Sequence, residues 1–412
     1  MAPFRFVHAA DLHIDSPLLG LASRSAEFAA RIDEASRQAF DNLVSLAKEE
    51  ECRFVLLAGD LFDGQWRDFR TGLFFADRMR RLKETDITVF IVLGNHDAEN
   101  TFMRRLELAD NVRVLSRREP ETVRLDDLGV AIHGRSFPQR DVTENFARNY
   151  PAPIAGLFNI GLLHTACDGR EGHALYAPCS VEDLVNRGYD YWALGHVHAH
   201  EMVCRDPYIV FPGNLQGRHV RETGPKGAML VTVDGNRVVE AVHRALDVIR
   251  WSVATVDISA CTDMDEVRSR ARETLLRAAD AADGRGLALH LRVCGPAALH
   301  DEIVAQEVAF GEEIQTIAAA ASDRIWIEKV EIDTAPPHQA APDPTISGRI
   351  QAIVEELRSD PTFAEILDRT LGELRQKLPA GARAGEFLAG IRNEALARAA
   401  RLSAALIVGA KE

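Results

Sequence analysis

Short apolar runs alternate with amphipathic stretches over the first 245 residues or so of the chain. Apolar residues recur at helical spacing through 30–50 and again through 69–83. β-rich runs flank these stretches at 4–9, 53–58 and 87–93. This β-α-β-α-β order predicts a parallel sheet covered by helices. Further strands are predicted at 129–133, 160–164, 191–194, 208–211, 228–233 and 237–243, the last two as a hairpin turning at Asp234-Gly235-Asn236.

The pattern changes after Asp247, where a second and smaller β-α-β-α-β module begins. Its predicted strands are 251–258, 287–293 and 325–332, and its predicted helical stretches are 263–282 and 297–320. The alternation predicts a small domain that packs its own helices against its own sheet.

Prolines mark a linker behind this module, since four of them fall within 334–344. Beyond the linker the pattern is helical and contains no convincing strand, with helices predicted at 346–358, 361–378 and 386–408. The predicted domains are therefore a first domain of 1–246, a capping domain of 247–333, a proline-rich linker of 334–344 and a helical tail of 345–412.

The 412 residues carry a net charge of −14, and residues 247–333 hold more than half of the acidic excess, with nine basic against seventeen acidic side chains. An acidic surface argues against coating nucleic acid by bulk electrostatics, but it leaves room for a local site. The longest apolar runs fall far short of the roughly 20 residues needed to span a bilayer. With no apolar signal region and no C-x-x-C pair among six cysteines, we expect a cytoplasmic protein with reduced thiols.

Side chains that commonly bind metals follow the predicted strands of the first domain. The five motifs are Asp11-Leu12-His13, Gly59-Asp60, Gly94-Asn95-His96-Asp97, His164 and Gly195-His196-Val197-His198. In open α/β sheets, ligands bind at the carboxyl ends of the strands. Alternation places Asp11 and His13 on one side of the chain, and likewise His196 and His198, so that each pair can hold one ion. The glycine before Asp60, like those in the third and fifth motifs, permits a close backbone approach.

A mixture of Asp, Asn and His suits a borderline divalent cation better than Ca²⁺, and the lack of cysteine disfavours structural zinc. Two neighbouring ions need a bridging carboxylate, and Asp60 is the natural bridge because it is central in the set. A single histidine at a strand end is most often structural, and an isolated D-x-H means little. It is the joint order of five motifs, four of them behind an apolar run, that indicates a metal centre.

In this order the motifs resemble those of the calcineurin-like metallophosphoesterases and, more narrowly, those of SbcD-type DNA-repair exonuclease subunits. Asp15-Ser16-Pro17 and the stretch 211–219 resemble the YhaO-like branch of these proteins. The superfamily motifs span 4–198, and the match to the branch extends to about residue 230. The resemblance implies an α/β fold, namely a metallophosphoesterase βαβ sandwich with a small α+β capping domain and a helical tail that binds an SMC-like ATPase.

The resemblance also implies roles for individual residues. One ion would be held by Asp11, His13, Asp60 and His198, and the other by Asp60, Asn95, His164 and His196. His96 matches the family histidine that protonates the leaving oxygen or stabilises the transition state. Asp97 would orient His96, with a plain helix N-cap as an equal alternative. Asp63 stands where some family nucleases have a second histidine, and it is a candidate for a supporting catalytic role.

Basic side chains follow Pro212-Gly213-Asn214 in the branch-specific stretch. Arg218, His219 and Arg221 are candidates for contacts with substrate phosphates. The alternative is that they are ordinary solvated charges of a loop.

The resulting hypothesis is a metal-dependent DNA exonuclease of DNA repair, working on DNA with an SMC-like ATPase subunit bound through the tail. It would use two divalent ions, with Mn²⁺ as the first choice and Fe²⁺, Zn²⁺ or Mg²⁺ as alternatives. A homodimer is typical of the family, and 30–50 and 69–83 are candidate interfaces. Two other functions stay open: hydrolysis of small phosphodiesters, nucleotides or phosphoproteins, and a non-catalytic scaffold for the ATPase. The extra domains disfavour the first, and the complete ligand set disfavours the second.

Overall fold

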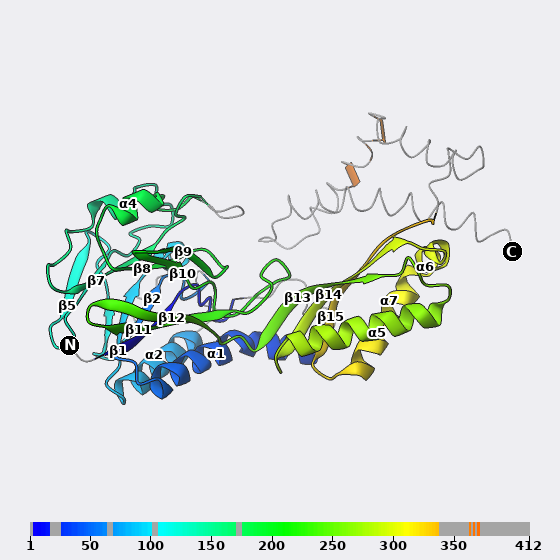
Figure 1. The fold of residues 1–412 in the computed structure, drawn as a ribbon, viewed down its shortest axis with the longest axis horizontal. Coiled ribbons are helices and arrows are strands. Elements are labelled where there is room, and N and C mark those ends of the chain that lie inside the picture. The colour runs from blue at the N-terminus through cyan, green and yellow to red at the C-terminus, as the bar shows by residue number, and fades with distance from the viewer. Residues whose placement is uncertain are drawn as a thin grey trace. The chain divides into compact units, whose positions relative to one another are not determined.

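The chain forms two compact units, one of residues 1–252 with 282–288 and one of 253–281 with 289–412 (Figure 1). The computed structural model describes residues 3–16, 26–63, 69–100, 106–169 and 175–337, together with Thr362, Phe363, Ile366, Arg369 and Thr370. Almost all of the predicted tail, 345–412, therefore lies outside the described residues, and its three expected helices stay a prediction.

A six-stranded mixed sheet forms one half of the first unit, in the order β12-β11-β1-β2-β3-β4. Its strands are β1 (Phe4–Ala9), β2 (Phe54–Ala58), β3 (Thr88–Val92), β4 (Val112–Val114), β11 (Gly227–Asp234) and β12 (Arg237–Ala245). β1 to β4 run parallel, whereas β11 is antiparallel to β1 and to β12. The predicted hairpin of β11 and β12 is confirmed, and its turn places Gly235 and Asn236 at positive φ, as a tight hairpin turn requires.

A second six-stranded mixed sheet has the order β5-β6-β7-β8-β10-β9. Its strands are β5 (Glu121–Leu125), β6 (Val130–Gly134), β7 (Phe158–His164), β8 (Tyr191–Gly195), β9 (Glu201–Arg205) and β10 (Tyr208–Phe211). The four central strands are parallel, and the edge strands β5 and β9 are antiparallel to their neighbours. The sequence did not predict the edge strands β4, β5 and β9. The parallel order expected for the strands at 4–9, 53–58 and 87–93 is confirmed by β1, β2 and β3, and their sheet is mixed because β11 is antiparallel to β1.

The two sheets pack face to face over an aromatic core. The rings of Phe6 and Phe54 from the first sheet stack with centroids 4.9 Å apart, and Tyr191 from the second sheet meets Phe6 edge-on at 5.3 Å. On the outer face of the first sheet lie α1 (Ala26–Glu49) and α2 (Arg70–Lys83), and the outer face of the second is covered around Trp192 by α4 (Val181–Val185) and a short 3₁₀ turn. The expected α/β sandwich is confirmed as a four-layer arrangement (Figure 1).

The second module has three strands in the order β13-β14-β15. Its elements are β13 (Ile249–Asp257), α5 (Met264–Ala281), β14 (Gly286–Pro296), α6 (His300–Ala305), α7 (Glu307–Ala321) and β15 (Ile325–Ala335). A backbone hydrogen bond joins Gly286 to Val248, where β14 and β13 begin, and another joins Ile258 to Cys294, where they end. β13 and β14 are therefore parallel. Helical crossovers between parallel neighbours make the module α/β, not the expected α+β. The predicted helix 297–320 is two helices, which meet at Gln306.

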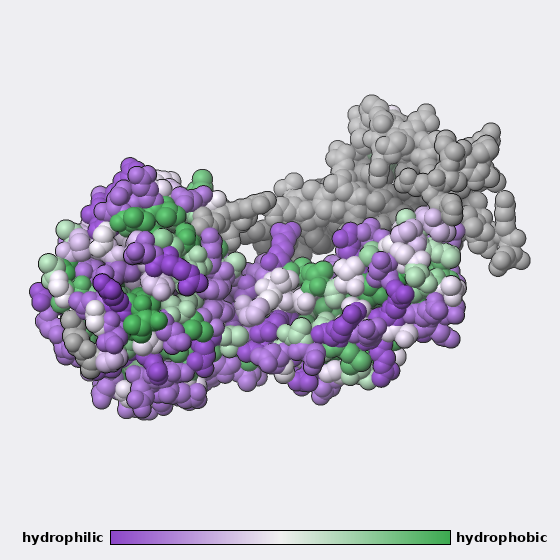
Figure 2. All heavy atoms as spheres, in the orientation of Figure 1, coloured by the Kyte–Doolittle hydropathy of each residue, from purple (hydrophilic) through white to green (hydrophobic). Residues whose placement is uncertain are grey.

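Arginines of the second module pair with acidic residues of the same module. Arg268 contacts Asp265 and Glu313, and Arg292 contacts Asp333. Figure 2 shows hydrophilic side chains over most of the visible face of the described residues, with the apolar ones in separate patches. These pairs leave the net acidic excess of the module unchanged, because their arginines are already counted in it. None of the helices in the described part of the chain combines the length and apolar composition that a membrane-spanning segment requires.

Candidate metal centre

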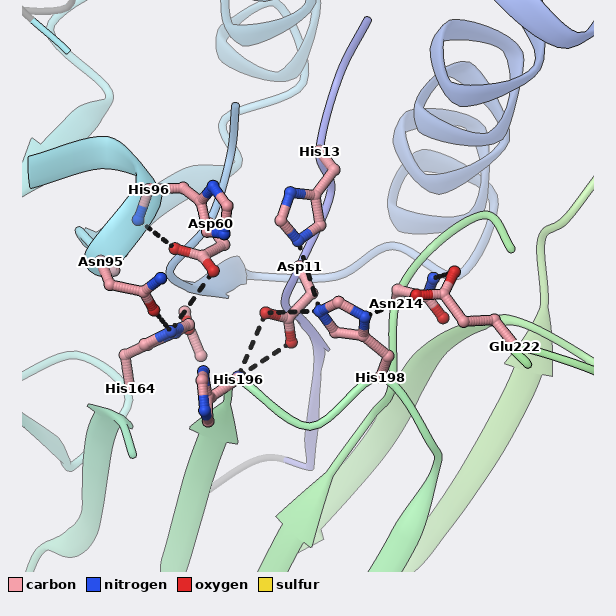
Figure 3. A network of polar contacts seen from close by, with 12 residues as sticks. Asp11, His13, Asp60, Asn95, His96, His164, His196, His198, Asn214 and Glu222 are labelled. Carbon is pink, nitrogen blue, oxygen red and sulfur yellow. Dashed lines mark hydrogen bonds and ion pairs between the residues drawn. The ribbon is translucent and has the colours of Figure 1, made fainter. Parts of the chain in front are cut away.

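The seven predicted ligands meet at the carboxyl ends of strands from both sheets (Figure 3). From the first sheet, Asp11 and His13 follow β1, Asp60 follows β2, and Asn95 follows β3 as the first residue of α3 (Asn95–Ala98). From the second sheet, His164 ends β7, and His196 and His198 follow β8. The Nε2 atom of His164 lies 3.5 Å from a carboxylate oxygen of Asp60, across the junction of the sheets. The two halves of the sandwich therefore contribute to one site.

Four of the ligands have an unusual backbone conformation. Asp11, His13, Asp60 and His196 have φ angles of 51°, 41°, 53° and 103°, in the region that non-glycine residues rarely adopt. Backbone hydrogen bonds of 3.0 Å from Asp11 to Gly59 and of 3.1 Å from His13 to Asp60 hold two of these turns in place. Strained backbone of this kind persists only where the surrounding structure holds it, and it is found mainly at functional sites.

Close backbone approach at the glycines, expected from the sequence, is confirmed. A Cβ atom on Gly94 would collide with the carboxylate of Asp60, and one on Gly195 would collide with the carbonyl oxygen of Ala58. Neither of these neighbours can move without moving a strand end or a ligand. Glycine is therefore required at both positions for the ligands to come together.

One cluster of ligand atoms comprises Asp11, His13 and His198, whose atoms lie within 4.8 Å of one another. The two Nε2 atoms of His13 and His198 are 3.3 Å apart, and Nε2 of His198 is 3.9 Å from an Asp11 oxygen. Within the described residues, Nδ1 of His13 is buried without a hydrogen-bond partner. The Nε2 atoms of two histidines that converge on a buried carboxylate fit a bound cation, whereas Nδ1 of His13 lies 3.8 Å from the carboxylate of Asp63.

A second cluster comprises Asp60, His164 and His196, with Asn95 beside them. Nδ1 of His164 lies 2.8 Å from the carbonyl oxygen of Ala58, which only an N–H group can satisfy. Burial lowers the pKa of His164, so the ring is neutral and its Nε2 carries a lone pair. That lone pair faces the side-chain oxygen of Asn95 at 3.0 Å. Two acceptor atoms facing each other suit a shared metal ion.

The charges of the site also fit divalent cations. Asp11 and Asp60 are 1% and 2% exposed. Burial and the charge of Asp60 raise the pKa of Asp11 well above its usual range. Burial likewise lowers the pKa of His13, which favours the neutral ring that binds metals. Buried carboxylates and neutral imidazoles are the donor set of Mn²⁺, Fe²⁺ and Zn²⁺, and bound cations would remove the cost of holding these carboxylates in their charged form.

His96 is not part of these two clusters, but it forms a third group of converging ligand atoms with Asp63 and His13. The Nδ1 atom of His96 is 2.7 Å from one carboxylate oxygen of Asp63, and the other oxygen accepts a hydrogen bond of 2.8 Å from the Ser16 hydroxyl. Burial lowers the pKa of His96, but the hydrogen bond to Asp63 and the charges of Asp60 and Asp63 outweigh burial, so the net pKa is raised. The structure thus pairs His96 with Asp63.

Asp97 does not make the expected contact with the His96 ring, but it does cap a helix: as the third residue of α3 it accepts the backbone N–H of Gly94, which precedes that helix. Its buried carboxylate accepts backbone N–H groups of Leu61 at 3.0 Å, Phe62 at 3.1 Å and Gly94 at 3.1 Å. Burial and the charge of Asp60 raise its pKa to about 7, against the effect of these hydrogen bonds. Among the hydrogen bonds of the described residues, none joins its side chain to the ring of His96. Asp97 therefore ties the loops after β2 and β3 together, while Asp63 contacts the ring.

The three basic candidates lie at different depths. Arg218 is mostly buried, with its guanidinium 3.2 Å from the Glu222 carboxylate and 4.0 Å from that of Asp63. His219 is half exposed, and its Nε2 atom lies 3.5 Å from Glu222. Arg221 is exposed, and its backbone N–H donates to His219. The structure thus brings Arg218 close to the centre and leaves Arg221 farther out.

Comparison with known proteins shows the family to which this sequence belongs. Residues 4–200 match the calcineurin-like phosphoesterases, and residues 251–335 match the middle domain of the metallophosphoesterase YhaO. The chain is 37% identical over 273 residues to the uncharacterized metallophosphoesterase YhaO of Bacillus subtilis (strain 168), covering 65% of this chain and 67% of that protein. The chain belongs to the YhaO family of calcineurin-like metallophosphoesterases. The β13–β15 module is accordingly the middle domain of this family.

More distant relatives carry the name DNA double-strand break repair protein Mre11. The protein of that name from Methanopyrus kandleri is 26% identical over 304 residues, which cover 65% of this chain and 62% of the relative. The one from Methanocaldococcus jannaschii is 26% identical over 252 residues, which cover 56% of this chain and 63% of the relative. The chain thus spans less than two thirds of the length of these Mre11 proteins.

Two contacts of this YhaO-family site were not predicted, although Ser16 lies in the branch motif Asp15-Ser16-Pro17. Glu222 accepts a hydrogen bond of 2.7 Å from Nδ1 of the ligand His198, and Ser16 donates to Asp63. A lone glutamate in a loop, 24 positions after the histidine that it contacts, belongs to no motif with metal-ligand spacing. Only the fold of the loop 212–222 brings the two together.

Replacing Asp97 with alanine is expected to destabilise the fold by about 3 kcal/mol. The change would leave three buried backbone N–H groups without an acceptor, and each such group costs roughly 1–3 kcal/mol, less whatever the loops recover by rearranging. Asp97→Asn, which keeps one acceptor oxygen, should lose less. Urea unfolding of the metal-free protein measures both, and equal stability of Asp97→Ala and wild type would contradict this account of the loops.

Proposed function

We propose that this YhaO-family protein is a metal-dependent exonuclease that hydrolyses phosphodiester bonds of DNA in DNA repair. The observation that carries the proposal is the pair of ligand clusters at the junction of the sheets, with the His96–Asp63 pair at their edge. The family supports hydrolysis of phosphate esters, and the names of the Mre11 relatives support DNA as the substrate.

Ligand assignment follows the clusters and the family pattern. One ion would be held by Asp11, His13, Asp60 and His198, and the other by Asp60, Asn95, His164 and His196, with Mn²⁺ as the proposed metal. When bound, two such ions supply positive charge for the phosphate oxygens and activate water for attack. The chain itself supplies the ligands from two sheets, so that both positions are fixed before the substrate arrives.

His96 would act on the leaving oxygen. Because its Nδ1 is held by Asp63 at 2.7 Å, its Nε2 is the atom available to the substrate. A protonated His96 donates a proton or a hydrogen bond from Nε2 to the departing oxygen, and Asp63 stabilises the charged ring and holds its orientation. The contact of Nδ1 with the Asp63 carboxylate favours the protonated form.

Substrate and partner contacts extend the proposal beyond the metal ions. Arg218, His219 and Arg221 would contact backbone phosphates of the DNA. The tail, 345–412, would bind an SMC-like ATPase subunit in the cytoplasm, and α1 or α2 would form a homodimer contact. These parts of the proposal rest on the family resemblance and the relatives' names.

Substrate choice tests the proposed function directly. The purified protein is incubated with Mn²⁺ and end-labelled linear duplex DNA, and in parallel with a chromogenic phosphodiester. We expect shortened DNA with Mn²⁺ and none after chelation by EDTA. A closed circular duplex is the matched control, since an exonuclease needs an end.

Each other outcome favours one of the alternatives. Hydrolysis of the small ester alone would contradict the nuclease and favour a metallophosphoesterase for small substrates. No hydrolysis of any substrate, with the ATPase present as well as absent, would favour a scaffold. Cleavage of the circular duplex at the same rate would contradict the exonuclease in favour of an endonuclease.

A further inference from the structure

We infer that Glu222 is a positioning residue for one of the two metal sites, because it fixes the metal-binding form and direction of His198. The inference rests on the metal centre proposed above and names a residue that the ligand motifs do not contain. It predicts that a single substitution outside the ligand set weakens the binding of one ion and not of the other.

Glu222 is held from several directions at once. It is 6% exposed, and both of its carboxylate oxygens are occupied. One oxygen accepts from Nδ1 of His198 at 2.7 Å and from a guanidinium nitrogen of Arg218 at 3.2 Å. The other accepts from the side chain of Asn214 at 2.8 Å and from the backbone N–H of Arg218 at 2.7 Å. A buried carboxylate with four donors has one orientation available to it, so it is a rigid anchor for its partners.

The bond to Glu222 decides which nitrogen of His198 carries the proton. A carboxylate oxygen only accepts, so Nδ1 of His198 must donate. A guanidinium nitrogen of Arg218 lies 3.2 Å from the same Nδ1, but an N–H group cannot accept from it, which leaves the carboxylate as the partner of Arg218. The Nε2 atom of neutral His198 then carries its lone pair toward Asp11 and His13, as Figure 3 shows.

A carboxylate behind a histidine strengthens that histidine as a ligand. The negative charge raises the basicity of the ring, and the hydrogen bond fixes its rotation. The backbone of His198 is held separately, because the buried Nζ of Lys226 donates to its carbonyl oxygen at 2.7 Å. Removing the charge of Glu222 should therefore release the ring while the strand end stays in place.

The second cluster has no equivalent side chain on its histidine at β7. There the group behind His164 is the carbonyl oxygen of Ala58, at 2.8 Å, which belongs to the backbone of β2. A substitution of Glu222 cannot alter that bond. The two sites therefore differ in the group that holds a histidine. For His198 it is the side chain of Glu222, which a substitution can change, and for His164 it is a backbone carbonyl of β2, which a substitution leaves in place.

Glu222→Gln is the test, with Mn²⁺ as the probe. Wild type should bind two ions per chain, and their coupling should appear in the electron paramagnetic resonance spectrum. In Glu222→Gln we expect the affinity for the ion at His198 to fall about 10- to 100-fold, the range for such supporting groups. The affinity for the other ion should be unchanged. The signal of the coupled pair should therefore be lost at limiting Mn²⁺. Glu50→Gln is the matched control, since Glu50 pairs with Arg5 and Arg244 far along the chain and contacts no ligand histidine.

The tautomer of His198 gives a readout that a general loss of stability would not change. Long-range ¹H–¹⁵N spectra of the metal-free protein should show Nδ1 of His198 protonated in wild type and a mixture of tautomers in Glu222→Gln. If the glutamine variant does not fold, Glu222→Asp, which keeps the charge but shortens the reach, should weaken the same site.

Two results would overturn the inference, and they are distinguishable. Equal affinities for both ions in wild type and variant, with an unchanged tautomer, would overturn the role of Glu222 and leave the metal centre standing. A wild-type protein that takes up no pair of ions would overturn the proposed centre and this inference together.

Discussion

Replacing Asp60 with asparagine is expected to reduce hydrolysis about 1000-fold or more, because the variant should fail to hold the pair of ions. Metal ions contribute several kcal/mol to such reactions, and each 1.4 kcal/mol is a factor of ten in rate. Asp60 is the proposed bridge, and its carboxylate lies 3.5 Å from His164. Asparagine has the same shape and can still accept the backbone N–H of His96, which Asp60 accepts at 3.0 Å, so the fold should survive.

The same substitution should raise the thermal stability of the protein when no metal is present. The charge of Asp60 contributes to the raised pKa of both Asp11 and Asp97, which means that these buried carboxylates repel one another. Removing one charge relieves that repulsion. In EDTA, Asp60→Asn should therefore melt at a higher temperature than wild type, whereas added Mn²⁺ should stabilise wild type and have little effect on the variant.

Metal content, hydrolysis and thermal melting measure these effects in one preparation. Asp127→Asn is the matched control, because Asp127 is exposed and its ion pair is with Arg53, outside the ligand set. A variant at position 60 that retains two ions per chain would contradict the bridging role. One that melts lower than wild type in EDTA would contradict the repulsion between the buried carboxylates.

Replacing His96 with alanine is expected to slow DNA hydrolysis by about 10²- to 10⁴-fold, the usual contribution of a general acid. Both ions should remain, because the ring is not among the seven proposed ligands and the backbone N–H of His96 still donates to Asp60. The loss should depend on the leaving group. A p-nitrophenyl ester departs without needing a proton, so its hydrolysis should fall much less than that of DNA.

Comparing the two substrates separates the roles of His96. An equal loss on DNA and on the nitrophenyl ester would refute proton donation and favour stabilisation of the transition-state charge. Loss of a metal ion would instead make His96 a ligand. Asp63→Asn should give a smaller loss in the same direction, because Asp63 contacts His96 at 2.7 Å and only supports it. His290→Ala, in the middle domain, is the control for removing a partly buried histidine.

The sequence predicted the central strands well because their signal is local. β1, β2 and β3 are short and mostly apolar runs in which Arg5 of β1 is the exposed residue, and a polar motif follows each of them closely. β4 has three residues and β5 and β9 are partly exposed edge strands, so they show neither an apolar run nor a clear alternation. Their pairing with a neighbour, not their composition, defines them.

The ligand motifs could be recognised in the sequence, whereas the supporting contacts could not. Asp97 adjoins His96 in sequence, and this suggested that it orients the ring. Helical geometry in α3 sends their side chains to different sides, so Asp97 reaches the backbone of Leu61 and Asp63 reaches the ring. Glu222 is linked to His198 only through the course of an irregular loop, for which residue spacing carries no information.

Each ion of the proposed centre would have ligands from both sheets, and this makes the metals cross-links of the sandwich. Asp11 and His13 belong to one sheet and His198 to the other, and Asp60 and His164 are divided in the same way. A small slide of one sheet over the other would change the size of both coordination spheres at once. The packing of Phe6, Phe54 and Tyr191 between the sheets would then tune metal affinity from a distance, so that core residues with no contact to the site could determine which metal it selects.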